Sequence, residues 1–120
     1  MKICMIGTGY VGLVSGTCFA DIGHQVYCVD KDASKINKLN SGISPIYEPG
    51  LDELIQKNYK AKRLTFTTDL KKAITASDII FICVGTPNIK GSLKVDLSFV
   101  FKCTKEILSI TKKKKIIVTK

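Results

Sequence analysis

The sequence predicts an α/β fold, a doubly wound parallel sheet with helices on both faces. Two observations support this prediction. Short apolar runs of strand character alternate with longer segments of helical period along all 120 residues, and a glycine-rich turn joins the first strand to the first helix. Regular alternation of strands and helices is typical of a parallel sheet with right-handed crossovers. At 45% hydrophobic and 24% charged residues, the composition is that of an ordinary globular domain.

The first predicted unit is a buried strand followed by a helix. The strand is Lys2–Ile6, the helical period begins at Val11, and Gly23 supplies a stop signal. We expect the buried face of this helix to consist of small and apolar residues, namely Val11, Val14, Ser15, Cys18, Phe19 and Ile22.

The second unit repeats this pattern. Gln25–Val29 is predicted as a strand, and Asp32 can cap a helix that turns Ile36 and Leu39 inward and ends at Gly42. An irregular loop, Ile43–Gly50, follows.

Three further strands are predicted in the rest of the chain. In order, the elements are a helix at Leu51–Lys57, a weak strand at Leu64–Thr67, a helix at Asp69–Thr75, a strand at Ile79–Val84, a polar loop at Gly85–Val95, a helix capped by Asp96, and a strand at Lys115–Thr119. The face of the last helix should hold Leu97, Val100, Phe101, Thr104, Ile107, Leu108 and Thr111. A doubly wound dinucleotide fold normally has six strands, so we expect five strands of an incomplete sheet.

Charge and composition argue against nucleic acid and membrane partners. The chain carries 19 Lys and Arg residues against 10 Asp and Glu, a formal charge of +9, but Arg63 is its only arginine. Proteins that read bases commonly use arginine forks, and no aromatic residue interrupts the run Lys112–Lys115. The longest apolar run, Ile79–Val84, is far shorter than the roughly 20 residues that span a bilayer.

The cysteines suggest neither a metal site nor a disulfide framework. They stand at positions 4, 18, 28, 83 and 103, without a C-x-x-C pair, and the chain has one histidine. We expect five reduced thiols in core positions, no bound metal and a cytoplasmic location.

A G-x-G-x-x-G pattern carries the chemistry of the chain. Gly7, Gly9 and Gly12 follow the first strand and open the first helix, and the second strand leads into Asp30. This context is that of a dinucleotide-binding turn. Gly7 permits the tight turn, Gly9 lets the backbone approach a pyrophosphate, and Gly12 lets the helix pack closely.

The start of the first helix should bind the phosphates. The N–H groups near Tyr10 and Val11 have no helical partners and lie at the positive end of the helix dipole. They are therefore expected to face the pyrophosphate of the cofactor.

Asp30 should select the cofactor. Its carboxylate can accept hydrogen bonds from the adenosine ribose hydroxyls. A 2′-phosphate would instead be repelled, by about 4 kcal/mol per charge pair at a distance of about 4 Å and an effective dielectric constant of roughly 20. NAD is therefore expected to bind better than NADP. Lys31 should point to the other side of the extended backbone, while Lys35 can reach the ribose or Asp30.

Three stretches resemble the N-terminal domain of the UDP-glucose/GDP-mannose dehydrogenase family. They are Gly7–Leu13 (GTGYVGL), Gly42–Leu51 (GISPIYEPGL) and Cys83–Pro87 (CVGTP), and their order and spacing match. The resemblance covers essentially all 120 residues and implies a Rossmann-type sheet.

The resemblance also implies an activity and a set of contacts. The family oxidises the C6 alcohol of a nucleotide sugar such as UDP-glucose to a carboxylate, using two NAD per substrate. By the family's pattern, Val11, Asp30, Lys35 and Thr86 contact NAD. Tyr47–Leu51 would lie near the active-site cleft, but the resemblance carries no catalytic role to Glu48.

The family's catalytic cysteine lies in a downstream glycine-rich segment that has no counterpart here, so no residue is assigned a catalytic role. We expect residues 1–120 to be the NAD-binding portion, with the nucleotide sugar bound mainly by a downstream domain and no turnover by this chain alone. The full-length protein is expected to be a homo-oligomer.

Two alternatives remain open at this point. One is another two-domain NAD-dependent dehydrogenase, acting on UDP-N-acetylmannosamine, GDP-mannose, a hydroxyacid or 6-phosphogluconate. The other is a non-catalytic NAD-binding module.

Overall fold

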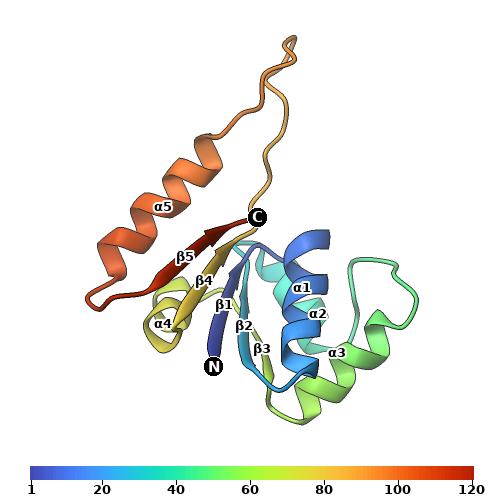
Figure 1. The fold of residues 1–120 in the computed structure, drawn as a ribbon. Coiled ribbons are helices and arrows are strands. Elements are labelled where there is room, and N and C mark those ends of the chain that lie inside the picture. The colour runs from blue at the N-terminus through green and yellow to red at the C-terminus, as the bar shows by residue number, and fades with distance from the viewer.

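The computed structural model describes all of residues 1–120 (Figure 1). Its elements, in chain order, are β1 (Lys2–Ile6), α1 (Tyr10–Asp21), β2 (Gln25–Val29), α2 (Ala33–Asn40), α3 (Leu51–Lys60), β3 (Leu64–Thr67), α4 (Leu70–Ala76), β4 (Ile79–Ile82), α5 (Ser98–Ile110) and β5 (Ile116–Thr119). The five strands form one sheet in the order β3-β2-β1-β4-β5, and all neighbouring strands are parallel. The doubly wound parallel fold predicted from the sequence is confirmed.

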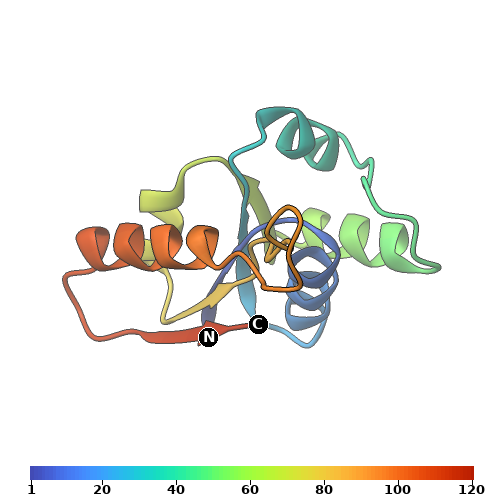
Figure 2. The same ribbon diagram turned by 90° about the horizontal axis from the view of Figure 1, so that it is seen from above.

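The sheet separates two apolar cores. Figures 1 and 2 show α1, α2 and α3 on one side of the strands and α4 and α5 on the other. Successive residues of β1 point to opposite faces, so Ile3 and Met5 pack in the first core while Cys4 and Ile6 pack in the second. The two-sided burial explains why the central strands are continuous apolar runs.

The chain order reverses at β1, which pairs with β2 on one side and with β4 on the other. In an open parallel sheet, such a switch point leaves a crevice at the carboxyl ends of the strands. The fold therefore places a crevice at the carboxyl end of β1, next to Ile6, where the glycine-rich turn begins. None of the helices is long and apolar enough to cross a bilayer.

The buried face of α1 differs from the expected one. Its buried residues are Gly12, Leu13, Gly16, Thr17 and Ala20, whereas Cys18 is exposed and Ile22 is 72% exposed. A Cβ on Gly16 would lie 2.9 Å from Cys28 Sγ and 3.0 Å from Met5 Cγ. Close approach of α1 to the sheet therefore decides which residues are buried, and Gly12, Gly16 and Ala20 lie on the face turned toward the sheet.

The apolar face predicted for α5 is also too wide. Only the stripe containing Cys103 and Ile107 is buried, while Leu97, Phe101 and Leu108 are 45%, 60% and 63% exposed. One helix resting on a sheet buries a narrow stripe, so the remaining apolar residues of α5 stay at the surface.

Several boundaries shift by a few residues. The fourth strand ends at Ile82 rather than Val84, because its neighbours β1 and β5 end at Ile6 and Thr119 in the same register. Asp96 lies one residue before the N-cap Leu97, although its Oδ1 still accepts a hydrogen bond from Ser98 N at 2.9 Å.

The other revisions are smaller. Helix α3 extends to Lys60 instead of Lys57, α1 begins at Tyr10, α4 runs one residue later than expected, and β5 begins at Ile116. The Asp32 cap is confirmed, since its Oδ1 accepts hydrogen bonds from Ser34 N and Lys35 N.

Candidate cofactor-binding site

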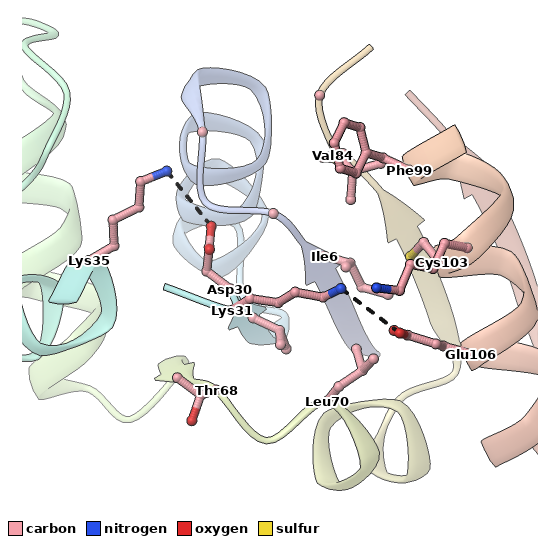
Figure 3. Close-up of a pocket in the computed structure, with 16 residues that line it drawn as sticks. Ile6, Asp30, Lys31, Lys35, Thr68, Leu70, Val84, Phe99, Cys103 and Glu106 are labelled. Carbon is pink, nitrogen blue, oxygen red and sulfur yellow. Dashed lines mark ion pairs between the residues drawn. The ribbon is translucent and has the colours of Figure 1, made fainter. Parts of the chain in front are cut away.

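A cleft of about 610 Å³ opens at the carboxyl ends of β1, β2 and β4 (Figure 3). One wall comes from the glycine-rich turn and the end of β2, and the opposite wall comes from α5. Apolar side chains, including Leu70, Val84 and Phe99, face the same space as Asp30 and Lys35. A cleft with apolar walls and a few charged groups has the character of a small-molecule site.

The turn between β1 and α1 requires glycine for two separate reasons. Gly7 has a φ of +106°, and its N–H donates to the Val29 carbonyl at 2.7 Å. A Cβ on Gly12 would lie only 1.9 Å from the Gly7 carbonyl oxygen. These two glycines therefore shape the turn itself, and their roles follow from contacts inside the protein.

Gly9 is different because nothing in the protein occupies the space beside it. It lines the cleft and is the N-cap of α1, and no heavy atom lies within 4 Å of an added Cβ. The open side of Gly9 thus leaves room for a ligand to approach the backbone, as a pyrophosphate does in dinucleotide-binding turns.

The first turn of α1 is suited to an anion. No side chain caps the helix, and the first turn carries no acidic residue. The side chains of Tyr10 and Val11 are exposed, so their N–H groups begin the helix at an accessible end. Free N–H groups and the helix dipole both favour a phosphate at this position.

Asp30 directly follows β2 and is held by three short hydrogen bonds. Its Oδ2 accepts from Thr8 N at 2.9 Å and from Thr8 Oγ1 at 2.8 Å, and its Oδ1 accepts from Asp32 N at 3.0 Å. Burial raises the pKa of Asp30, but these hydrogen bonds and the charge of Lys35 outweigh it and leave the pKa below its ordinary value. The carboxylate stabilises the fold above the ordinary pKa of Asp, and this contribution is lost as the pH falls through the lowered pKa.

The two lysines that follow β2 point in different directions (Figure 3). Lys35 Nζ lies 4.0 Å from Asp30 Oδ2, which is the position expected for a group that reaches Asp30. Lys31 extends away from Asp30, as expected, and forms an ion pair with Glu106 of α5 at 3.9 Å. Lys31 nevertheless lines the cleft, so the two walls are joined by a charged contact.

The structure brings together four of the predicted site residues as cleft-lining groups, namely Gly7, Gly9, Asp30 and Lys35. Tyr10 and Val11 lie next to the turn but do not line the cleft; the Tyr10 hydroxyl donates to Glu48 Oε2 at 2.8 Å. Gly12 supports the turn from behind, and Thr86 is exposed in the loop after β4, outside the lining.

The site predicted from the sequence did not include the α5 wall of the cleft or Thr8, the residue that holds Asp30. Phe99, Lys102, Cys103 and Glu106 line the cleft from a helix that lies far along the chain from the glycine turn. Thr8 is fully buried in the x position between Gly7 and Gly9. Its hydroxyl could have been suspected as a partner for the carboxylate at the end of the next strand, because both follow adjacent parallel strands.

The cysteines are free, but not all lie in the core. Cys18 is exposed, whereas Cys83 is half-buried, packs against the first core as expected and also lines the cleft. Burial raises the pKa of Cys4 to about 12 and that of Cys103 to about 11, so neither is an activated thiolate at neutral pH. The structure gathers no group of three His, Cys, Asp or Glu residues suited to a metal ion.

Comparison with known proteins agrees with this geometry. A model of the UDP-glucose/GDP-mannose dehydrogenase family, NAD binding domain, matches residues 1–120. UDP-glucose 6-dehydrogenases of Rhizobium meliloti and Bacillus subtilis are 55% and 56% identical over 120 and 119 residues, which cover 100% and 99% of this chain. The chain spans only 28% and 26% of the lengths of these two relatives.

A solved structure shows the same fold. The ternary complex of GDP-mannose dehydrogenase from Pseudomonas aeruginosa superposes with a TM-score of 0.94 at 41% identity, covering 99% of this chain and 28% of that one. Given the match along its whole length, the chain belongs to the UDP-glucose/GDP-mannose dehydrogenase family and is its NAD-binding domain.

Proposed function

We propose that this chain is the cofactor-binding part of an enzyme that oxidises UDP-glucose to UDP-glucuronate with two molecules of NAD. The observation that carries the proposal is the Asp30 carboxylate, fixed at the end of β2 in the same cleft as the open side of Gly9. Identity supports UDP-glucose as the sugar, because two relatives with that activity in their names share 55% and 56% of the residues.

The residues proposed to hold NAD fall into three groups. The backbone of the glycine-rich turn and the start of α1 receive the pyrophosphate, and Asp30 with Lys35 receives the adenosine ribose. Thr86 contacts the cofactor from the loop after β4. The full set is Gly7, Gly9, Tyr10, Val11, Gly12, Asp30, Lys35 and Thr86.

NAD supplies the hydride acceptor for the oxidation when it is bound. The residues of this chain orient and select it, while the sugar is bound mainly by a further domain of the longer protein. Hydride transfer needs the sugar C6 to lie about 3–3.5 Å from the acceptor, and we place that alignment between the two domains. We further propose that the whole enzyme is a homo-oligomer and, from the five free thiols, that it works in the reducing cytoplasm.

Calorimetric titration of the chain with NAD and NADP tests the cofactor assignment. We expect NAD to bind better, and we expect Asp30→Asn to narrow the difference because it removes the charge that repels a 2′-phosphate. Glu53→Gln removes one negative charge from the exposed surface of α3 and is the matched control. Equal affinity for both cofactors in the unmodified chain would contradict the assignment.

The sugar assignment requires the full-length protein. NADH formation with UDP-glucose, GDP-mannose and UDP-N-acetylmannosamine, each at the same concentration, should be fastest with UDP-glucose. Preference for either of the other sugars would replace UDP-glucose while leaving the NAD site intact. The 120-residue chain alone should form no NADH from UDP-glucose.

A further inference from the structure

Thr8 has an unusual position for a residue in a surface turn. It is 0% exposed, although both of its neighbours, Gly7 and Gly9, line the cleft. Its backbone N–H and its hydroxyl both point at one oxygen of Asp30, Oδ2, at 2.9 and 2.8 Å. The hydroxyl thus hydrogen bonds to a residue 22 positions away, at the end of the neighbouring strand.

These contacts determine which oxygen of Asp30 is available to a ligand. A carboxylate has about four lone-pair sites, two on each oxygen. The two Thr8 donors occupy both sites of Oδ2, whereas Oδ1 accepts only from Asp32 N. Oδ1 therefore retains one free acceptor site, while Oδ2 is committed to the protein.

The same contacts restrict rotation of the carboxylate. Two donors from Thr8 on Oδ2 and a third from Asp32 on Oδ1 restrain both oxygens of the carboxylate. Lys35 Nζ, 4.0 Å from Oδ2, adds charge without a direct hydrogen bond. Removing the Thr8 hydroxyl would free one site on Oδ2 and leave the carboxylate held by a single backbone N–H on each oxygen, which restrains its orientation less.

We propose that Thr8 is a positioning residue for cofactor discrimination: it holds Oδ2 of Asp30 so that Oδ1 alone meets the adenosine ribose and the charge stays fixed against a 2′-phosphate. The proposal deepens the function proposed above and rests on it. Thr8 itself need not touch the cofactor, because it acts through Asp30.

The test compares Thr8→Val, which keeps the shape and backbone N–H but removes the hydroxyl, with Thr8→Ser, which keeps the hydroxyl. We expect Thr8→Val to reduce the ratio of NAD to NADP affinity about tenfold, the effect of uncoupling residues in one hydrogen-bond network. Thr8→Ser should keep the ratio of the unmodified protein. Thermal unfolding checks that each variant is folded, and Thr8→Ala is a second variant without the hydroxyl.

A double-variant cycle separates a positioning role from a general structural one. In a background of Asp30→Asn, Thr8→Val should have no further effect on the ratio, because the group it positions is no longer a carboxylate. Additive effects of the two substitutions, or an unchanged ratio in Thr8→Val, would overturn the proposal.

Titration of the Asp30 carboxyl by NMR in the absence of cofactor distinguishes failure of this proposal from failure of the proposed function. Loss of a hydrogen bond to the charged form should raise the pKa of Asp30 in Thr8→Val but not in Thr8→Ser. An unchanged titration would show that Thr8 does not hold Asp30. A raised pKa combined with no effect of Asp30→Asn on cofactor preference would instead refute the ribose assignment, and with it the discrimination role.

Discussion

The two connections that border the cleft are built in opposite ways. The β1–α1 turn is short and buried at Thr8, and its donors reach across to Val29 and Asp30 on the next strand. The β4–α5 loop, residues 83–97, is long and exposed from residue 85 onward, and backbone hydrogen bonds of this exposed part join residues of the loop to one another, as in Ile89 N to Lys94 O at 2.8 Å. Leu93 in that loop is 97% exposed.

This difference separates a preorganised side of the site from an adaptable one. The turn is fixed before any ligand arrives, because the positions of Gly7 and Gly12 follow from steric contacts inside the protein and Thr8 is hydrogen bonded to Asp30. The β4–α5 side offers mainly apolar surface and an exposed loop. We infer that cofactor selectivity is determined at the turn, while the β4–α5 side contributes contact area.

The largest expected effect concerns the backbone of the turn. Gly12→Ala would put a Cβ 1.9 Å from the Gly7 carbonyl oxygen, whereas a Cβ on Gly85, in the β4–α5 loop, would meet only Pro87 Cδ at 4.0 Å. Gly12→Ala should therefore destabilise the fold by about 3 kcal/mol. Gly85→Ala should leave stability nearly unchanged. Denaturant unfolding of both variants measures the difference, and equal losses would remove the contrast between the two connections.

A substitution at Gly9 should weaken NAD binding without changing the stability of the fold. With no atom within 4 Å of an added Cβ, Gly9→Ala should change the free energy of unfolding by less than about 0.5 kcal/mol. Its methyl group would enter the space that the pyrophosphate needs, so NAD affinity should fall about a hundredfold. Calorimetry tests this, with Cys18→Ala on the exposed side of α1 as control. Unchanged NAD affinity would show that the phosphates lie elsewhere.

The alkylation rates of the cysteine thiols should show whether NAD occupies the β4–α5 side of the cleft. Cys83 is half-buried and lines the cleft, whereas Cys18 is exposed on α1. NAD at about ten times its dissociation constant should slow alkylation of Cys83 roughly tenfold. Alkylation of Cys18 should not change, and the buried thiols of Cys4, Cys28 and Cys103 should react only on unfolding. Mass spectrometry of labelled peptides gives each rate, and protection of Cys18 alone would contradict the position of the cleft.

Thr86 should give the smallest effect. Its side chain lies in the exposed loop and has at most one neutral hydrogen bond to offer, a net contribution of about 0.5–1.5 kcal/mol. We expect Thr86→Ala to weaken NAD binding about threefold in calorimetry. A loss as large as that of Gly9→Ala would mean that selectivity and affinity are not concentrated at the turn.

The preorganised side was also the more predictable from sequence. Gly7 and Gly12 are required by contacts inside the protein, Gly9 leaves space for a ligand, and Asp30 follows from the spacing of two strands. The parallel, doubly wound sheet was predicted in a similar way, because a regular alternation of strands and helices leaves few topologies.

What the sequence did not reveal depends on contacts between distant segments. The hydrogen bond between Thr8 and Asp30 and the α5 wall of the cleft arise only when segments 22 or more positions apart become neighbours. The buried faces of α1 and α5 were predicted wrongly for a similar reason. Apolar periodicity identifies a helix, but the distance between that helix and the sheet decides which stripe is buried.

An NMR titration of the amide resonances with NAD tests the central claim most directly. If the turn selects and binds the cofactor, the largest shifts should occur at the amides of Gly9, Tyr10, Val11 and Asp30, and residues 88–95 should shift least. Largest shifts in residues 88–95, with the turn unaffected, would contradict the account.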